Sequence, residues 1–221
     1  YDRYENQHTE IFDLENSDRA FEEEVMLGGF GNAEVKPEGS GVVYEQAQET
    51  FTARYSHETI ALAFSLTEEA VEDNLYDKIS TRYTKALARS MANTKQIKAA
   101  NVLNRAFNSS FLGGDDKELC ATDHPTLSGT QKNELSTAAD LNETSLEQML
   151  IDIADMKDER GMKIALRGMK MIIPVNLQFV AERLMKSAGR VGTADNDLNA
   201  VRSMGMVPQG YVVNNFLTDT D

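Results

Sequence analysis

Apolar residues recur at helical spacing through one unusually long stretch of the chain, residues 65–108. Ser65 with Glu68 three positions later resembles a capping box, and residues 74–77 are a soft point where the helix would kink or restart. A continuous helix of this length would reach about 60 Å, longer than a small domain is wide. The apolar positions follow one another on one helical face: Leu75, Ile79, Tyr83, Leu87, Met91, Leu103 and Phe107.

An alternating segment precedes this helix and predicts β-structure. Phe51, Ala53 and Tyr55 alternate with polar residues, and the run at residues 60–64 continues the extended pattern. Glycines between residues 28 and 41 exclude a helix there, so we expect residues 42–44 to form the opposing strand. The pattern therefore predicts a long two-stranded hairpin over residues 29–64. Such a hairpin is marginally stable alone, and we expect it to lie against another surface.

The last third of the chain mixes helical and strand patterns. Thr144 and Glu147 form a capping-box pattern before a helix with one apolar face. Buried strands are predicted at residues 164–166, 169–173 and 211–216, with a second helix opening at Pro174. Residues 111–139 are rich in Gly, Asp, Ser, Thr and Asn and predict a connector. The fold class is therefore α+β, with a compact lobe covered by helices after the hairpin and long helix.

The formal charge of the chain is strongly negative, −14 at pH 7. This balance argues against a protein that coats nucleic acid with its whole surface, since such binding needs many lysines and arginines. Residues 1–25 hold much of the acidity and predict an extended arm that docks on another surface, with a short helix near Ser17. The absence of a long apolar run or a signal pattern predicts no membrane segment.

Positive charge gathers within residues 78–108 of the long helical stretch instead. From Lys78 to Asn108 the sequence has no Asp or Glu, but seven cations: Lys78, Arg82, Lys85, Arg89, Lys95, Lys98 and Arg105. Basic residues favour a helix C-terminus, but that effect fades within one turn and does not require seven. Three interpretations stay open, namely the acidic arms of neighbouring subunits, the phosphates of a nucleic acid, and solubility alone.

Two motifs resemble catalytic or nucleotide-binding chemistry. Cys120 and His124 could form a thiolate–imidazole pair, but only if their side chains meet beside an oxyanion site; a role in ordering the turn before Pro125 is the simpler interpretation. The glycine-rich residues 189–197 lack the Lys-Ser/Thr of a P-loop and follow a helix. One cysteine and three scattered histidines predict no disulfide framework, metal site or cofactor. We therefore expect no enzyme.

In the order of its structural elements and in several short sequence segments, the chain resembles the major capsid proteins of tailed bacteriophages with the Hong Kong 97 fold. The order is an acidic arm, a projecting hairpin, a long helix and an α+β lobe. Similar strings are LTEEAVEDNLYDKI, KALARSM, AANVLNRAFNSSF, CATDHP, SLEQMLIDIADMKDERG and RVGTADNDLNAVRSMG. The resemblance implies an N-terminal arm at residues 1–28, an extended loop at 29–64, a peripheral domain with spine helix and connector at 65–140, and an axial domain at 141–221.

The resemblance also implies roles for particular residues. The extended loop would cross the neighbouring subunit through Phe51, Arg54 and Tyr55. The inner basic face would meet packaged double-stranded DNA or an acidic arm through Arg82, Lys85, Arg89, Lys95, Lys98 and Arg105. The axial loop, where copies converge in pentamers and hexamers, would use Arg190, Thr193, Asp195 and Asp197. Further partners would be scaffold, maturation protease, portal and decoration proteins, with assembly in the host cytoplasm and a final place in the virion.

Two alternatives remain beside this shell subunit. An encapsulin-type nanocompartment has the same fold but encloses a cargo protein, and a Cys-dependent hydrolase would use Cys120 and His124. The resemblance also implies that a start at Tyr1 would fit removal of an N-terminal scaffolding segment by a maturation protease. Peripheral strands that follow the axial domain in the family are expected to be missing here after Asp221.

Overall fold

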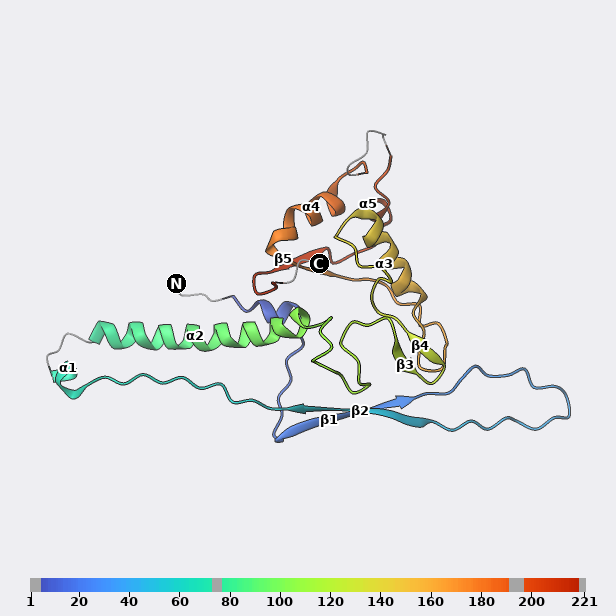
Figure 1. Ribbon diagram of the computed structural model, residues 1–221, viewed down its shortest axis with the longest axis horizontal. Helices are drawn as coiled ribbons and strands as arrows, with labels where there is room; N and C mark the ends of the chain where they lie inside the picture. The colour runs from blue at the N-terminus through green and yellow to red at the C-terminus, as the bar shows by residue number, and fades with distance from the viewer. Residues whose placement is uncertain (1–4, 73–76, 191–196, 219–221) are drawn as a thin grey trace.

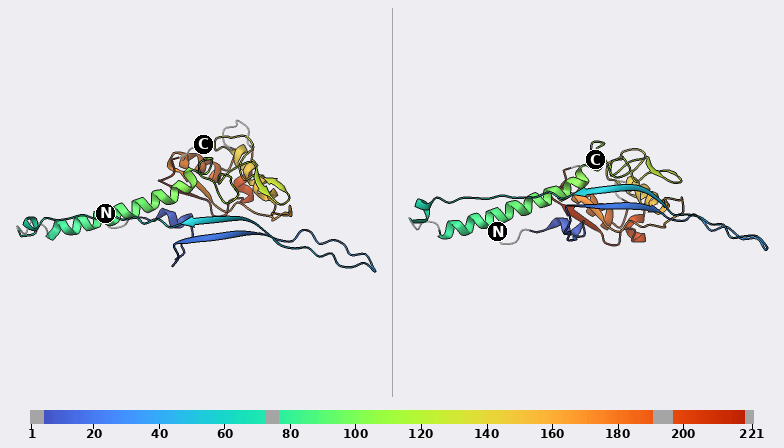
Figure 2. Two further views of the ribbon diagram at one scale, coloured as in Figure 1. Left: turned by 60° about the horizontal axis from the view of Figure 1, so that its bottom comes forward. Right: turned by 90° about the horizontal axis from the view of Figure 1, so that it is seen from below.

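The computed structural model describes residues 5–72, 77–190 and 197–218. Three parts are apparent: a long hairpin, a long helix and an α+β lobe (Figure 1). The lobe lies between two projections that leave it in opposite directions, the helix on one side and the tip of the hairpin on the other (Figure 2). This arrangement agrees with the α+β class and with the element order expected from the sequence.

The hairpin is built from β1 (Phe21–Gly28) and β2 (Gln48–Ser56), which pair antiparallel. The prediction that residues 42–44 oppose β2 is wrong, because those residues lie in an irregular stretch beyond the ladder. The acidic run at residues 22–24 lies within β1, where Arg54 is opposite Glu23 and donates from Nε to Oε1 at 2.6 Å. The expected N-terminal arm therefore supplies one strand of the hairpin.

The long helical stretch contains α1 (Glu68–Glu72) and α2 (Asp77–Asn104). The predicted soft point falls mainly on residues 73–76, which lie outside the described residues. At 28 residues, α2 is about 42 Å long, shorter than expected because it begins at Asp77 and ends at Asn104. Residues 57–67 run back beside it (Figure 1), with the Phe64 and Tyr83 rings 5.9 Å apart. The strand predicted at residues 60–64 is irregular extended chain.

The lobe begins with α3 (Glu143–Asp155), whose N-cap is Asn142 rather than the predicted Thr144. The Asn142 side chain accepts the Ser145 N–H at 2.9 Å, and the Ser145 hydroxyl accepts the Asn142 N–H at 3.0 Å. The apolar face of α3 is confirmed, because Leu146 and Leu150 are buried against residues from other elements. One buried cluster of the lobe is Leu146, Leu150, Val201 and Val207, and Ile173, Ala181 and Leu184 are buried as well.

A two-stranded parallel sheet crosses the lobe, formed by β5 (Met171–Pro174) and β6 (Tyr211–Asn214). The chain between them holds η2 (Val175–Leu177), α4 (Gln178–Lys186) and α5 (Ala200–Met204), which fits the long crossover that parallel strands need. Strands at residues 169–173 and 211–216 are thus confirmed in shorter form. The strand predicted at residues 164–166 is absent, and Ala165 has a left-handed φ of 55° there.

The connector between helix and lobe holds a small hairpin that the sequence did not predict. Strands β3 (His124–Thr126) and β4 (Gly129–Gln131) pair antiparallel. Gly129 has a φ of 136°, which a residue with a side chain would adopt only with strain. At the other end of the chain, the one short helix described before β1 is η1 (Gln7–Glu10), not the helix expected near Ser17.

The surface of the molecule is far larger than that of a compact protein of equal mass. The accessible area is 16414 Å² for a chain of 24.6 kDa, whereas a compact monomer of that mass exposes roughly 10,000 Å². Two projections leave the body of the subunit (Figure 2). Large apolar side chains are exposed on both of them, among them Val35, Tyr44 and Val102, and on the lobe as well. A chain of this shape buries its remaining apolar surface only by association.

Candidate assembly surfaces

The base of the β1–β2 hairpin rests on the connector. A Cβ atom added to Gly28 would lie 2.5 Å from Leu127 Cδ1, and one added to Gly114 would lie 3.1 Å from the Ala53 backbone nitrogen. Both glycines therefore allow an approach that a side chain would block. The connector loop and the β3–β4 turn form a support that holds the hairpin at its base.

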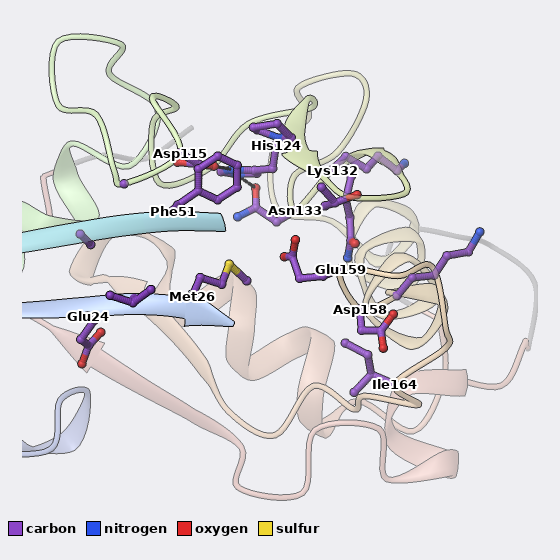
Figure 3. Close-up of a pocket in the computed structure, with 17 residues that line it drawn as sticks. Glu24, Met26, Phe51, Asp115, His124, Lys132, Asn133, Asp158, Glu159 and Ile164 are labelled. Carbon is purple, nitrogen blue, oxygen red and sulfur yellow. Dashed lines mark hydrogen bonds and ion pairs between the residues drawn. The ribbon is translucent and has the colours of Figure 1, made fainter. Parts of the chain in front are cut away.

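A cavity of about 700 Å³ lies between the hairpin and this support (Figure 3). Met26 and Phe51 enter it from the hairpin, while Asp115, His124 and Glu159 face it from the connector and the turn after α3. Among the described residues, Glu159 Oε2 is buried without a hydrogen-bond partner. The cavity therefore lies at the contact between the hairpin and the support, and the polar groups that face it come from the support.

Both ring nitrogens of His124 face hydrogen-bond acceptors. Nδ1 lies 2.6 Å from Asp115 Oδ2, and Nε2 lies 3.2 Å from Asn133 Oδ1. The Asn133 amide is oriented by the backbone, because Oδ1 accepts the Ala121 N–H at 2.9 Å and Nδ2 donates to the Leu119 carbonyl at 2.7 Å. His124 therefore links Asp115 in the connector loop to Asn133, just after β4.

Asp115 is the charged partner in this group. Burial opposes its ionisation, but the hydrogen bond from His124, the Lys117 backbone N–H and the charge of His124 together hold the pKa of the carboxyl below its usual value of 3.8. The Asp115–His124 pair ties the connector loop to β3 and so keeps Gly114 against β2. Its structural effect is to fix the support under the hairpin.

The three residues expected to make the extended loop's contact with a neighbour lie in β2, beside the chain's own body. Phe51 is half-buried against the cavity, and Arg54 both bonds Glu23 and stacks 4.5 Å over the Phe21 ring. Tyr55 is 55% exposed. The part that projects is residues 29–47, which turns at a hydrogen bond from Ser40 N to Pro37 O. Its exposed apolar residues, missed from the sequence, are Phe30, Val35, Val42, Val43 and Tyr44.

All six cations expected to form a basic face are exposed, but they do not share one side of the helix. At 100° per residue, Arg82, Lys85 and Arg89 fall within about 60° of one another, whereas Lys95 and Lys98 are rotated by roughly 140° from that group. Lys98 pairs with Glu58, and Arg105, just beyond α2, stacks 4.2 Å over the Phe111 ring. The single face expected from the sequence is therefore two separate groups.

The expected axial loop is described only at its ends, because Thr193 and Asp195 lie outside the described residues. Arg190 N donates to the Asp197 carbonyl at 2.8 Å, closing the base of the loop. Arg190 Nε donates to Glu143 Oε2 at 3.2 Å, and the Glu143 side chain is only 9% exposed. The loop is thus anchored to the first turn of α3.

Cys120 and His124 do not form a joint site among the described residues. His124 faces the cavity beneath the hairpin, while Cys120 lines a second, mostly apolar cavity with Leu103 and Ile173. Burial, and next the charge of Glu134, raise the pKa of the Cys120 thiol above its usual value. This shift is opposite to the one that activates a nucleophilic cysteine.

The described residues carry neither a metal-binding cluster nor a membrane-spanning helix. No group of three or more His, Cys, Asp or Glu side chains there is placed to hold a metal ion. No helix there has the length and apolar character to cross a membrane. The features that remain are surfaces: a projecting loop, a basic helix and an anchored loop at the end of the lobe.

A large exposed surface and a projecting apolar loop are typical of a structural subunit that associates with other copies or partners. The family model described as phage capsid protein matches residues 49–221. The chain therefore belongs to the phage capsid protein family, and the expectation of a tailed-phage major capsid protein is confirmed. A comparison with curated proteins finds no match.

Solved phage capsids share the fold. The bacteriophage JBD30 capsid is 12% identical with a TM-score of 0.69, covering 91% of this chain and 88% of that chain. The JBD30 capsid decorated with minor capsid protein trimers is 12% identical with a TM-score of 0.72, covering 98% and 92%. The JBD30 procapsid is 14% identical with a TM-score of 0.53, covering 91% and 88%. At these identities the likeness concerns the fold alone.

Proposed function

We propose that this capsid protein assembles as pentamers and hexamers of a closed icosahedral shell, with the domain arrangement of the Hong Kong 97 fold. The observation that carries the proposal is the accessible surface of 16414 Å², about 1.6 times that of a compact monomer of the same mass. Such a surface suits a subunit whose stability comes from many repeated contacts. Its role is structural, without a catalytic step.

In this arrangement the projecting residues 29–47 cross a neighbouring subunit. Their exposed apolar side chains, with Val35 at 93% and Tyr44 at 94% exposure, are the contacts that the neighbour would bury. Residues 65–140 act as the peripheral domain and 141–221 as the axial domain. The β1 strand of the expected arm joins the extended loop, so the loop's base spans Phe21–Gly28 and Gln48–Ser56.

The helix stripe of Arg82, Lys85 and Arg89 faces the shell interior in this proposal and meets packaged double-stranded DNA. Phosphate neutralisation by Lys and Arg is the usual basis of sequence-independent DNA binding. Lys98 and Arg105, which lie outside this stripe, contact Glu58 and Phe111 within the chain. An acidic arm of a neighbouring copy is the competing partner for the same stripe.

Copies converge at the axial loop, with Arg190 and Asp197 at its base and Thr193 and Asp195 within it. The JBD30 capsid is described as decorated with minor capsid protein trimers; we extend that partner class to this protein, beside scaffold, maturation protease and portal. Assembly takes place in the host cytoplasm, and the mature protein resides in the virion.

The first experiment images the purified protein by negative-stain electron microscopy, with light scattering on the same sample. Closed shells tens of nanometres wide are expected, as for a self-assembling subunit. DNA inside the shells would support a viral capsid. A protein cargo inside them would instead indicate an encapsulin-type shell. A discrete monomer or dimer under all conditions, with scaffold supplied, overturns the proposal. Cys120→Ser should leave assembly unchanged, since the thiol has no part in it.

A further inference from the structure

Arg160 occupies a rigid turn between α3 and β5. The Asp158 carboxylate oxygen Oδ1 accepts the Arg160 N–H at 3.0 Å and the Met162 N–H at 2.7 Å. Gly161 completes the turn with a φ of 84°, and residues Lys157 and Lys163 form a β-bridge at its base. These bonds hold the backbone of Arg160 in one place, so its side chain starts from a fixed point.

The guanidinium of Arg160 reaches both strands of the hairpin where their ladder ends. Nε donates to the Gly29 carbonyl at 3.0 Å, and Nη2 donates to the Gln46 carbonyl at 3.1 Å. The last cross-strand pair is Gly28 with Gln48, so these two carbonyls lie just beyond it. One side chain therefore closes the end of the ladder from outside the hairpin.

A third contact of the Arg160 guanidinium reaches the projecting loop. Arg160 Nη1 lies 3.3 Å from Glu45 Oε1, and Glu45 Oε2 accepts the Gly31 N–H at 2.8 Å. The planar guanidinium can satisfy three acceptors in fixed directions, which a lysine ammonium on a flexible stem cannot. The Arg160 side chain is only 19% exposed, so its contacts are shielded from water more than ordinary surface pairs are.

We propose that Arg160 is a positioning residue that sets the direction in which residues 29–47 leave the body of the subunit, and so where the loop meets the neighbouring copy. The inference rests on the proposed self-assembly. Beyond Gly28 and Gln48 no ladder continues, and residues 32–47 are all exposed. The Arg160 contacts and the Glu45–Gly31 bond are what ties the loop at its base among the described residues.

A small change of angle at this base has a large effect at the tip. From Gly29 to the turn at Gly39 the chain spans ten residues, about 33 Å when extended. A rotation of about 10° at the base would move the tip by about 6 Å, more than the spacing of two paired strands. Assembly is therefore sensitive to Arg160 even though the residue lies far from the loop's tip.

The first test asks, within a single subunit, whether the Arg160 contacts fix the direction of residues 29–47. Spin labels at Val35→Cys and Met204→Cys, in a Cys120→Ser background, measure the distance from loop tip to lobe by pulsed electron resonance; Val35 and Met204 are 93% and 67% exposed. We expect Arg160→Ala to broaden the distance distribution clearly. Lys163→Ala removes a cation from the same turn whose ion-pair partner is Asp155, outside the hairpin, and should leave the distribution unchanged. An unchanged distribution in Arg160→Ala overturns the proposal.

Assembly is the second readout, on the full chain without labels. Arg160→Ala should reduce closed shells at least tenfold or give aberrant sizes, while its urea midpoint stays near that of Lys163→Ala. Arg160→Lys keeps the positive charge but loses the planar guanidinium with its several donors, so we expect it to restore shell formation only in part. Full restoration of shell formation would mean that the charge alone acts. If Arg160→Ala fails to fold, Arg160→Lys carries both readouts. Failure of the unmutated chain to form shells counts against the proposed function, while the label distances still decide on Arg160.

Discussion

The side-chain oxygen of Gln96 accepts the backbone N–H of His8 at 2.9 Å, and the two residues are only 1% and 4% exposed. The Gln96 amide also donates to the Glu5 carbonyl at 3.0 Å. One side chain in the middle of α2 thus fixes the N-terminal segment to the long helix. On its other side the segment bonds the lobe, because Gln7 accepts from Asn215 N at 2.9 Å and Lys170 donates to the Glu10 carbonyl at 3.0 Å.

Replacing Gln96 should release this segment. Gln96→Ala leaves the buried His8 N–H without its acceptor, and the expected loss is about 1–3 kcal/mol of unfolding free energy. Hydrogen exchange should rise in residues 5–12 more than in the core of the lobe, and urea unfolding measures the total loss. Lys95→Ala, an exposed neighbour on α2, is the matched control and should change neither. Equal exchange in both variants would contradict the role of Gln96.

The Asp115–His124 pair predicts a stability that depends on pH with a defined sign. The pKa of Asp115 is lowered in the folded state, so ionised Asp115 stabilises the fold above its usual value of 3.8. That contribution is lost as the pH falls through the lower folded-state value. Asp115→Asn should therefore be less stable than the unmutated chain at pH 6, with the difference shrinking toward pH 3.

Urea midpoints at several pH values measure this difference. Asp116→Asn is the matched control, because it removes the next carboxylate, and Asn tolerates the left-handed φ of 59° at that position. The stability difference between Asp116→Asn and the unmutated chain should not shrink in the same way at low pH. A constant gap between Asp115→Asn and the unmutated chain across the range would mean that the carboxylate charge does not stabilise the connector.

The elements that the sequence predicted well are those with local signals. The apolar spacing of α2 and α3 repeats over several turns, so each helix was located although its ends shifted. Helix α3 starts two residues earlier than expected because Asn142 and Ser145 cap each other, where Thr144 and Glu147 had seemed the better pair. Caps with similar residues two positions apart cannot be told apart by pattern alone.

The elements that the sequence missed depend on distant partners. The Glu22–Glu24 run carries a poor strand signal, and its partner strand is distant in sequence, since Glu23 pairs with Arg54, 31 residues away. Strands β3 and β4 have three residues each, too short for an alternating pattern to register. Arg160 lies in a charged run, residues 157–160, just after α3. Nothing local shows that its side chain reaches Gly29, 131 residues away.

The Arg82 stripe gives a prediction about salt. If this stripe contacts phosphate, Arg82→Ala should weaken binding of a double-stranded DNA fragment and reduce the slope of log affinity against log salt by about one. Fluorescence anisotropy over a series of KCl concentrations measures both. Lys95→Ala removes an equal charge from the other side of α2 and should leave the slope unchanged. Equal effects from the two variants would indicate a diffuse field, and no DNA binding at all would favour an acidic arm as the partner.

The Arg190–Glu143 pair predicts an energetic link between the axial loop and α3. The Glu143 carboxylate is 9% exposed and its bond to Arg190 Nε is 3.2 Å, whereas Arg190 itself is 41% exposed. A half-shielded pair lies between the exposed and buried cases, so we expect Arg190→Ala to cost about 1–2 kcal/mol of unfolding free energy.

A double-mutant cycle with Glu143→Gln separates this pair from its surroundings. If the two residues act together, Arg190→Ala should cost clearly less in the Glu143→Gln background, because the carboxylate charge is no longer left unpaired. The Lys186–Glu182 pair on α4 is the comparison, since both of its side chains are well exposed, and its coupling should be much smaller. Additive losses at Arg190 and Glu143 would mean that the loop is held by the Arg190–Asp197 backbone bond alone.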